Sequence, residues 1–285
     1  MKNKSEQINP GVKLIKGYFT SQNESQLISE WLDSHFHDSL GITAFLDQTQ
    51  TIDAPWQLLR LYDLSEIDAL LGVAVVLPGG TCFWLPQEQS SSAALLCSEI
   101  LKFQPRRIVT TLFGRDLLHS RLGHGHGHGH QASILREYDQ WIMVCTRRFP
   151  QANGRLAIAA DIPRLMEYQH LYNQERSVDE RSDWETLVQQ AKLAVHEVDS
   201  QIVAIVRFGI ESSRLVSIGG TYTFLEYRRQ GYATRVLEFA VNQIIKSGRI
   251  AYLIVDKDND PAIQLYEHMD FEKIGSSYVG YLAYS

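Results

Sequence analysis

The sequence predicts an α/β (α+β) protein, because short apolar runs typical of buried strands alternate with segments of helical apolar spacing. Its 285 residues are 44 % apolar and 10 % aromatic, which is ordinary for a globular chain. This length exceeds one small core and suits two medium-sized domains. Residues 149–154 resemble a linker, so we expect domains at 1–150 and 151–285.

The N-terminal half shows this alternation without a recognisable catalytic pattern. The strand at 71–77 ends at Pro78-Gly79-Gly80, and Gly114-Arg115 marks the expected end of a later strand. The full set of expected strands is 12–20, 57–62, 71–77, 107–113 and 136–146, with helices at 22–34 and 90–103.

The C-terminal half continues the pattern with a higher density of strands. Asp161 and Pro163 indicate a helix start, and Asp199-Ser200 predicts a hairpin turn. Gly219-Gly220, inside a β-branched run, predicts a bulge or a close backbone approach. Leu165, Met166, His170 and Leu171 are the expected inner face of the first helix. The expected strands are 155–160, 193–198, 202–210, 215–224 and 250–256, with a further helix at 184–192.

A short basic turn joins the strand at 215–224 to a helix that begins near Ala233. The turn reads Arg228-Arg229-Gln230-Gly231-Tyr232-Ala233, and Val236, Leu237, Ala240 and Val241 follow at helical spacing. Unpaired N–H groups at a helix N-terminus can bind a phosphate, which the helix dipole also favours. Gly231 lets a pyrophosphate approach the backbone, and the arginines add positive charge.

A second motif follows the apolar run at 250–256. Asn259 or Asp260 is a good N-cap, and Pro261 occupies a position that a first helical turn tolerates. The resulting pattern is Asn259-x-x-Ala262-x-x-Leu265-Tyr266-x-x-x-x-Phe271. It predicts a short helix that carries Tyr266.

The two motifs, in this order and at this separation, resemble the signatures of the GNAT superfamily of N-acetyltransferases over residues 153–285. The chain is most similar to a subgroup with an additional, divergent GNAT-like N-terminal domain. It departs from that subgroup at Phe224 and Leu225, which replace two prolines, and at Arg229, which replaces a glycine. The resemblance implies a mixed, mostly antiparallel sheet flanked by helices, with a second α/β N-terminal domain.

The resemblance also implies acetyl-CoA as co-substrate, with no metal, and a set of site residues. The backbone of Thr221, Tyr222 and Thr223 would pair with pantetheine like an added strand. Asn259 would bind the cofactor arm, and Tyr266 would be the general acid, since a phenol of pKa ~10 can protonate a departing thiolate. The expected pyrophosphate-binding residues are Arg228, Arg229, Gln230, Gly231, Tyr232, Ala233 and Thr234.

The sequence does not identify a general base or an acceptor. Glu175, Glu180 and Glu226 are candidates for the base, and a water chain is an equal alternative. The expected activity is acetyl transfer to the amine of a small or amino-acid-like molecule. A transferase for larger acyl groups and a CoA-binding regulatory module without catalysis are the alternatives. The polar segment at 172–183 is either a solvated loop or a wall of the acceptor site.

The composition and net charge limit the classes of partner and the cellular compartment that we expect. A net charge of −6 argues against a nucleic-acid surface. The sequence lacks an apolar window of ~18 residues and its first ten residues are polar, so we expect neither a membrane span nor a secretion signal. Three cysteines at no metal-ligand spacing indicate reduced thiols and a cytoplasmic protein. The sequence leaves open whether the chain acts alone or as a homodimer.

A Gly-His repeat at 123–130 is the other unusual segment. Its imidazoles could bind Zn²⁺, Ni²⁺ or Cu²⁺. Glycine between all the histidines opposes a preorganised site, so we interpret the segment as a solvated insertion and predict no metal centre.

Overall fold

The computed structural model describes residues 4–9, 12–17, 21–48, 57–63, 69–88, 90, 92–123, 132–176 and 181–285. The chain divides into two compact units. The N-terminal unit comprises Met1–Ile142, Asp256–Asp258 and Ile274–Ser285, and the C-terminal unit comprises Met143–Val255 and Asn259–Lys273. The last strand leaves the C-terminal unit after Lys273 and joins the N-terminal one.

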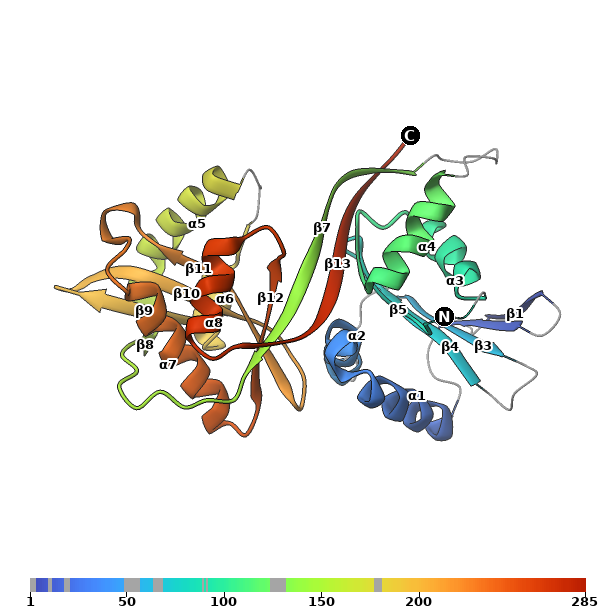
Figure 1. Ribbon diagram of the computed structural model, residues 1–285, viewed down its shortest axis with the longest axis horizontal. Helices are drawn as coiled ribbons and strands as arrows, with labels where there is room; N and C mark the ends of the chain where they lie inside the picture. The colour runs from blue at the N-terminus through green and yellow to red at the C-terminus, as the bar shows by residue number, and fades with distance from the viewer. Residues whose placement is uncertain are drawn as a thin grey trace. The chain divides into compact units, whose positions relative to one another are not determined.

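The N-terminal unit is a sheet with helices on both faces (Figure 1). Its strand order is β1-β2-β3-β4-β5-β6-β13-β7, in which β5 and β6 are parallel and β13 runs antiparallel to β6. Its elements are β1 (Lys4–Asn9), β2 (Val12–Lys16), α1 (Gln22–Ser34), α2 (Phe36–Gln48), β3 (Gln57–Asp63), β4 (Ala69–Val76), β5 (Thr81–Pro86), α3 (Ala93–Leu101), β6 (Arg107–Thr110), α4 (Leu112–Gly123), β7 (Ala132–Cys145) and β13 (Glu272–Tyr284).

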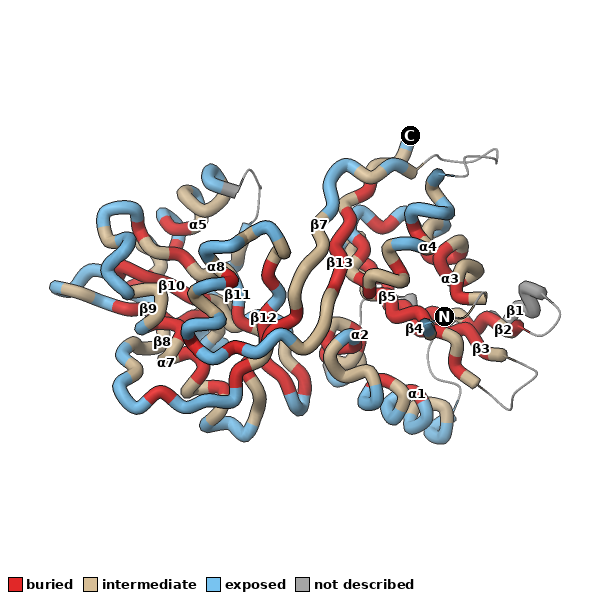
Figure 2. Tube along the Cα trace, viewed as in Figure 1, coloured by how far each residue is buried: buried red, intermediate tan, exposed pale blue. Residues whose placement is uncertain are grey.

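Alternation along the strands divides the core of this unit into two layers. In β4, Val73 and Val75 pack with α1 and α2, whereas Ala74 and Val76 pack with α3 and α4. Successive side chains of a strand point to opposite faces, so an apolar run such as β4 is buried on both sides. Figure 2 shows the resulting buried stretches along β3, β4 and β5.

The C-terminal unit has the strand order β12-β11-β10-β9-β8, antiparallel except for the parallel pair of β11 and β12. Helices α5 and α6 pack on one face, and α7 contacts β9, β10 and β11 on the other. Its elements are β8 (Arg155–Leu156), a 3-10 turn (Ala159–Asp161), α5 (Ile162–Arg176), α6 (Trp184–Gln189), β9 (Leu193–Val198), β10 (Gln201–Glu211), β11 (Leu215–Thr223), a second 3-10 turn (Leu225–Tyr227), α7 (Tyr232–Lys246), β12 (Ile250–Asp256) and α8 (Asp260–His268).

One order of elements occurs twice along the chain. The series β2-α1-α2-β3-β4-β5-α3-β6-α4-β7 is followed by the corresponding series β8-α5-α6-β9-β10-β11-α7-β12-α8-β13, whose last strand belongs mainly to the N-terminal unit. The predicted fold class, a mostly antiparallel mixed sheet flanked by helices with a second α/β domain, is therefore confirmed. The placement of the domain boundary stays a prediction.

Several local predictions are wrong. The strand expected at 107–113 ends at Thr110, and Gly114 lies inside helix α4. The structure buries Leu165 and Tyr168 on the inner face of α5, whereas Met166 is 58 % exposed and His170 is exposed. Helix α2 and strand β5 occupy segments for which the sequence pattern predicts no element.

Candidate functional site

Strands β11 and β12 pair only where both begin. The pairs are Leu215 with Ile250, Val216 with Ala251 and Ser217 with Tyr252. Across the described part of both strands, pairing ends there, although β11 continues to Thr223 and β12 to Asp256. On its other edge β11 stays paired with β10 as far as Thr223. The second half of β11 therefore has one main-chain edge that β12 does not use.

A bulge lies at the centre of this half strand. Arg207 pairs with Gly219 and Ile205 pairs with Tyr222, so two residues of β11, Gly220 and Thr221, oppose one residue of β10. Gly220 has a φ of +57°, and its carbonyl accepts a hydrogen bond of 3.0 Å from the Tyr168 hydroxyl. A Cβ at Gly220 would lie 2.8 Å from that hydroxyl oxygen, so a larger residue does not fit. The predicted bulge is confirmed.

Arg164 of helix α5 contacts the turn that follows β11. The guanidinium of Arg164 lies 3.4 Å from the centroid of the Phe224 ring and 3.6 Å from a carboxylate oxygen of Glu226. Its Nε also donates to the carbonyl of Ile202 at 3.3 Å. A cation over an aromatic face stabilises both groups. Arg164 thus holds the segment in which Phe224 and Leu225 stand instead of the two prolines of the resembling subgroup.

The following loop leads into an open helix N-terminus. Arg229 and Gly231 have φ values of +61° and +77°, and Gly231 is the N-cap of α7, which no side chain caps. A Cβ at Gly231 would meet nothing within 4 Å. The first-turn N–H groups of a helix lack intrahelical acceptors, and here neither a capping side chain nor packing covers the N-cap position. Arg229 and Arg235 pair with no carboxylate among the residues that the structure describes.

Arg228 has a carboxylate partner on the neighbouring helix. Its Nη2 lies 2.6 Å from Glu175 Oε1, and its Nε donates to the carbonyl of Thr223 at 3.0 Å. The Tyr222 hydroxyl donates to the same Glu175 oxygen at 3.3 Å. Burial, followed by the charge of Glu175, raises the pKa of Tyr222 above its usual value. Glu175 therefore lies next to the loop that we expect to bind pyrophosphate.

The remaining predicted loop residues lie around the start of α7. Tyr222 is buried by α5, whereas Thr221 and Thr223 are half-buried, so the strand offers its backbone. Thr221 Oγ1 is buried and bonds to no described group. Gln230 is exposed and donates to the carbonyl of Glu226 at 3.3 Å. Tyr232, Ala233 and Thr234 form the half-buried first turn of α7.

Asn259 and Tyr266 lie on the next motif. Asn259 caps α8, because its Oδ1 accepts from the N–H of Ala262 at 3.4 Å, and Tyr266 is half-buried with its ring centroid 5.7 Å from that of Phe271. The predicted N-cap is confirmed. β11 and β12 are parallel, so both carboxyl ends face the same edge of the sheet. The basic loop and the start of α8 therefore lie at that edge.

A histidine that the sequence pattern does not single out lies at the base of α7. His196 on β9 is 2 % exposed, and its ring stacks on Tyr232 at a centroid distance of 5.3 Å. Its Nδ1 is 3.1 Å from the carbonyl of Asn153, while Nε2 is buried with no partner in the described ranges. Burial lowers the pKa of His196 below its usual value. Only the fold reveals this contact, since β9 and α7 are far apart in the sequence.

Besides Glu175, the sequence offers Glu226 and Glu180 as candidates for the general base. Glu226 is 60 % exposed and faces Arg164, and Glu180 lies outside the described residues.

The predictions about metals, membrane spans and cysteines concern other parts of the chain. His124–His130 of the Gly-His repeat lie outside the described residues. Within the described ranges, no group of three or more His, Cys, Asp or Glu side chains is placed to hold a metal ion. No described helix is long and apolar enough to cross a membrane. Cys82, Cys97 and Cys145 are buried free thiols.

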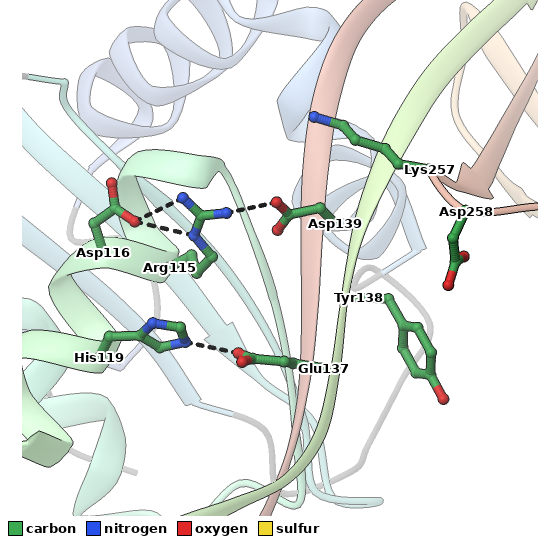
Figure 3. Close-up of a pocket in the computed structure, with 8 residues that line it drawn as sticks. All are labelled: Arg115, Asp116, His119, Glu137, Tyr138, Asp139, Lys257 and Asp258. Carbon is green, nitrogen blue, oxygen red and sulfur yellow. Dashed lines mark hydrogen bonds and ion pairs between the residues drawn. The ribbon is translucent and has the colours of Figure 1, made fainter.

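The N-terminal unit contains a separate pocket of about 430 Å³ between α4 and β7 (Figure 3). Its charged side chains largely neutralise one another. Arg115 lies 2.5 Å from Asp139 and 2.9 Å from Asp116, and His119 Nε2 lies 2.6 Å from Glu137. Lys257 lies 4.1 Å from the centroid of the Trp141 ring.

Comparisons with known proteins bear on the C-terminal unit and on the fold. A family model described as acetyltransferase (GNAT) family matches residues 162–271. A Drosophila protein of known structure has a TM-score of 0.61 at 11 % identity, over 92 % of this chain and 96 % of that one. A GNAT acetyltransferase from Colwellia psychrerythraea has a TM-score of 0.56 at 12 % identity, over 94 % and 98 %. A tandem GNAT protein from the clavulanic acid biosynthesis pathway has a TM-score of 0.53 at 12 % identity, over 96 % and 98 %. The comparison with curated proteins found no match.

Proposed function

We propose that the protein transfers an acetyl group from acetyl-CoA to an amine, because residues 162–271 match the model of the acetyltransferase (GNAT) family. The acceptor is a small or amino-acid-like molecule, and the transfer is direct. One observation carries the proposal: the half of β11 that β12 leaves unpaired on one edge leads into a helix N-terminus at Gly231 that no side chain caps.

The residues of this edge fit coenzyme A. The backbone of Thr221–Thr223 lies on the edge of β11 that β12 leaves unpaired, where a pantetheine arm can add like a strand. The N–H groups of the first turn of α7 can take the pyrophosphate, helped by Arg228 and Arg229. The Nδ2 of Asn259 is the donor available to the arm, because its Oδ1 caps α8.

Acetyl-CoA supplies a thioester whose carbonyl carbon an amine can attack. The C–N bond forms as the C–S bond breaks, the amine loses a proton, and the departing thiolate gains one. Tyr266 holds a hydroxyl proton on α8, at the edge where β11 and β12 end, and we assign it the role of general acid.

The base is a water chain in this proposal. The Glu175 carboxylate already accepts from Arg228 and Tyr222, which makes it a partner of the cofactor loop rather than a free proton acceptor. Helices α5 and α6 cover the face of the sheet beside the bulge, and we propose that they form the wall of the acceptor site. The free buried thiols support a cytoplasmic protein.

Two measurements test this function. Calorimetric titration with acetyl-CoA and CoA measures binding, and a thiol-release assay over a panel of amines measures turnover. We expect binding of both and turnover with at least one amine. Binding without turnover on any amine contradicts the proposal and supports the regulatory alternative. Turnover with longer acyl-CoAs but not with acetyl-CoA supports the alternative of a larger acyl group.

Replacing Tyr266 by Phe tests whether this residue is the general acid. We expect kcat to fall roughly ten- to a thousand-fold with little change in the KM for acetyl-CoA, because general acids contribute on that order. Tyr227→Phe is the matched control, since its hydroxyl bonds to Gln201 at 2.7 Å. An unchanged kcat in Tyr266→Phe removes this residue from the mechanism.

A further inference from the structure

The structure assigns a second anion site to the N-terminal unit, and we propose that it binds the phosphate group of a small molecule. The site is a pocket of about 550 Å³, within the usual range for small-ligand sites. Its lining includes Arg106, Arg136 and Tyr281, together with Gln104, Leu135, Leu282, Ala283 and Tyr284.

The charge of this pocket has one sign. No carboxylate lines it, and neither Arg106 nor Arg136 forms an ion pair with any described residue. Arg107, on the strand beside Tyr281, is likewise without a carboxylate partner in the described ranges. The chain as a whole carries a net charge of −6, so the sign of this pocket is opposite to that of the whole protein. An anion would relieve the repulsion between the arginines.

The neighbouring pocket in Figure 3 shows what compensated charges look like in the same unit. There, Arg115 is paired with Asp116 and Asp139 from α4 and β7. Because Arg115 and His119 already face carboxylates, these two side chains have little to offer an anion. In contrast, the guanidinium groups of Arg106, Arg107 and Arg136 around Tyr281 have no carboxylate partner among the described residues, so their N–H groups are available to a ligand.

The cationic groups are also held in place before any ligand arrives. The guanidinium of Arg136 lies 4.1 Å from the centroid of the Tyr281 ring, and that of Arg107 lies 5.8 Å from it. Tyr281 pairs with Arg107 across β13 and β6. The Tyr281 ring therefore interacts with guanidinium groups from the strands β6 and β7, and such cation–π contacts reduce the freedom that binding would otherwise remove.

Main-chain bonds fix Arg106 against β13. Its carbonyl accepts from the N–H of Leu282 at 2.9 Å, and the Tyr284 hydroxyl donates to the carbonyl of Pro105 at 3.0 Å. The planar guanidinium fork matches the oxygens of a phosphate better than a point charge does. A dianionic phosphate on a compact molecule therefore fits this site.

Titration calorimetry with inorganic phosphate tests the site in the full chain. Acetyl-CoA is kept saturating so that it occupies the loop before α7, and a repeat without it makes the result independent of the proposed function. Sodium chloride at equal ionic strength and malonate control for bulk charge and for carboxylates. We expect saturable phosphate binding that chloride does not reproduce and malonate reproduces only weakly.

Variants locate the binding. Arg106→Ala and Arg136→Ala should each weaken phosphate binding about ten-fold or more, and Arg136→Lys, which keeps the charge but loses the fork, should have an intermediate effect. Arg148→Ala, at an exposed arginine of the C-terminal unit, should change nothing. Melting temperatures verify that the variants fold, and Arg136→Lys remains informative if an alanine variant does not.

Three outcomes overturn the proposal. One is equal phosphate binding by Arg106→Ala, Arg136→Lys and the unmodified protein. Another is equal binding of malonate and phosphate. The third is binding to vesicles that contain phosphatidylglycerol without binding of inorganic phosphate, because the source would then be a lipid surface beside the exposed Leu135.

Discussion

The two units build the same junction of strand, loop and helix, β5 to α3 in one and β11 to α7 in the other. Both strands begin with three parallel pairs, Thr81–Phe83 with Arg107–Val109 and Leu215–Ser217 with Ile250–Tyr252. The short parallel pairing is therefore a property of the repeated fold. It does not by itself make a cofactor site.

The residues after those pairs differ. Counted from the first parallel pair, Leu85 and Pro86 hold the places of Gly219 and Gly220. Leu85 is buried in the core, and proline has no N–H to offer a bound chain. Gly220 instead forms the bulge together with Thr221, and its carbonyl accepts from Tyr168 of α5. The C-terminal junction therefore has a main-chain edge where the N-terminal one has a packed side chain and a missing donor.

The loops that follow the two strands also differ in charge and in the N–H groups that they leave open. Residues 87–92 contain Glu88 and no cation, and the N–H groups of Ala93 and Leu95 already donate to the carbonyls of Ser90 and Ser92. The loop before α7 contains two arginines and an open Gly231. This comparison teaches that the proposed phosphate site would depend on a few loop residues, whereas the surrounding architecture is common to both units.

The largest expected effect comes from placing a large side chain at Gly231, the open N-cap position of α7. Gly231→Phe should lower the affinity for acetyl-CoA about 100-fold or more, since it forces a side chain at a φ of +77° and covers N–H groups that would each make a charge-assisted bond. Calorimetry with acetyl-CoA measures the change. Ser90→Phe, at the corresponding loop, should leave the affinity unchanged. If Ser90→Phe also weakens binding, the N-terminal junction takes part in cofactor binding and the contrast between the units is wrong.

A smaller effect is expected at the ion pair beside the loop. Arg228→Ala makes the C-terminal loop more like the N-terminal one and should weaken acetyl-CoA binding about ten-fold. Glu175→Gln should strengthen it about two- to five-fold, because an exposed carboxylate 2.6 Å from Arg228 competes with a phosphate for the guanidinium.

Glu185→Gln on the neighbouring α6 is the matched control and should leave the affinity as it is. Weaker binding in Glu175→Gln would contradict the competition. It would mean that Glu175 holds Arg228 in the position that the cofactor needs.

Sequence patterns predict local features of this fold well and long-range ones poorly. The helix expected at 22–34 has the bounds of α1, and the Asp199-Ser200 turn and the Asn259 cap are in place. These features depend on neighbouring residues alone. The predicted cofactor-binding residues are Thr221–Thr223, Arg228–Thr234 and Asn259, and which of them bind acetyl-CoA stays a prediction.

The failures have a common physical origin. The sequence pattern predicts that Gly114 ends a strand, yet it lies in α4. A Cβ at this position would approach Thr110 Oγ1 to 2.0 Å, so close packing requires the glycine. A glycine required by close packing and a glycine required by a turn look the same in one sequence. The pairing of β13 with β6, the Arg164–Phe224 contact and the Arg228–Glu175 pair join segments far apart in the chain, so no local pattern reveals them.

The smallest expected effect concerns the buried ionisable residue on the strand that follows the first two helices of each unit. In β3 this is Arg60, whose Nε lies 3.2 Å from Glu24, so it stays charged and paired through neutral pH. In β9 it is His196, which is buried with its Nε2 unpaired within the described part of the chain. Protonation would place an unsatisfied charge beneath the start of α7.

The pH dependence of His196 follows from that difference. Its pKa is lower in the folded state than the 6.5 of the unfolded chain, so the folded state binds fewer protons. Its stabilising contribution is complete above about pH 6.5 and is lost as the pH falls through the folded pKa. Melting temperatures between pH 5 and 8 should fall on the acid side, and His196→Gln should flatten the part that His196 causes. An equally steep acid loss in His196→Gln would assign the dependence to other groups and remove this difference between β3 and β9.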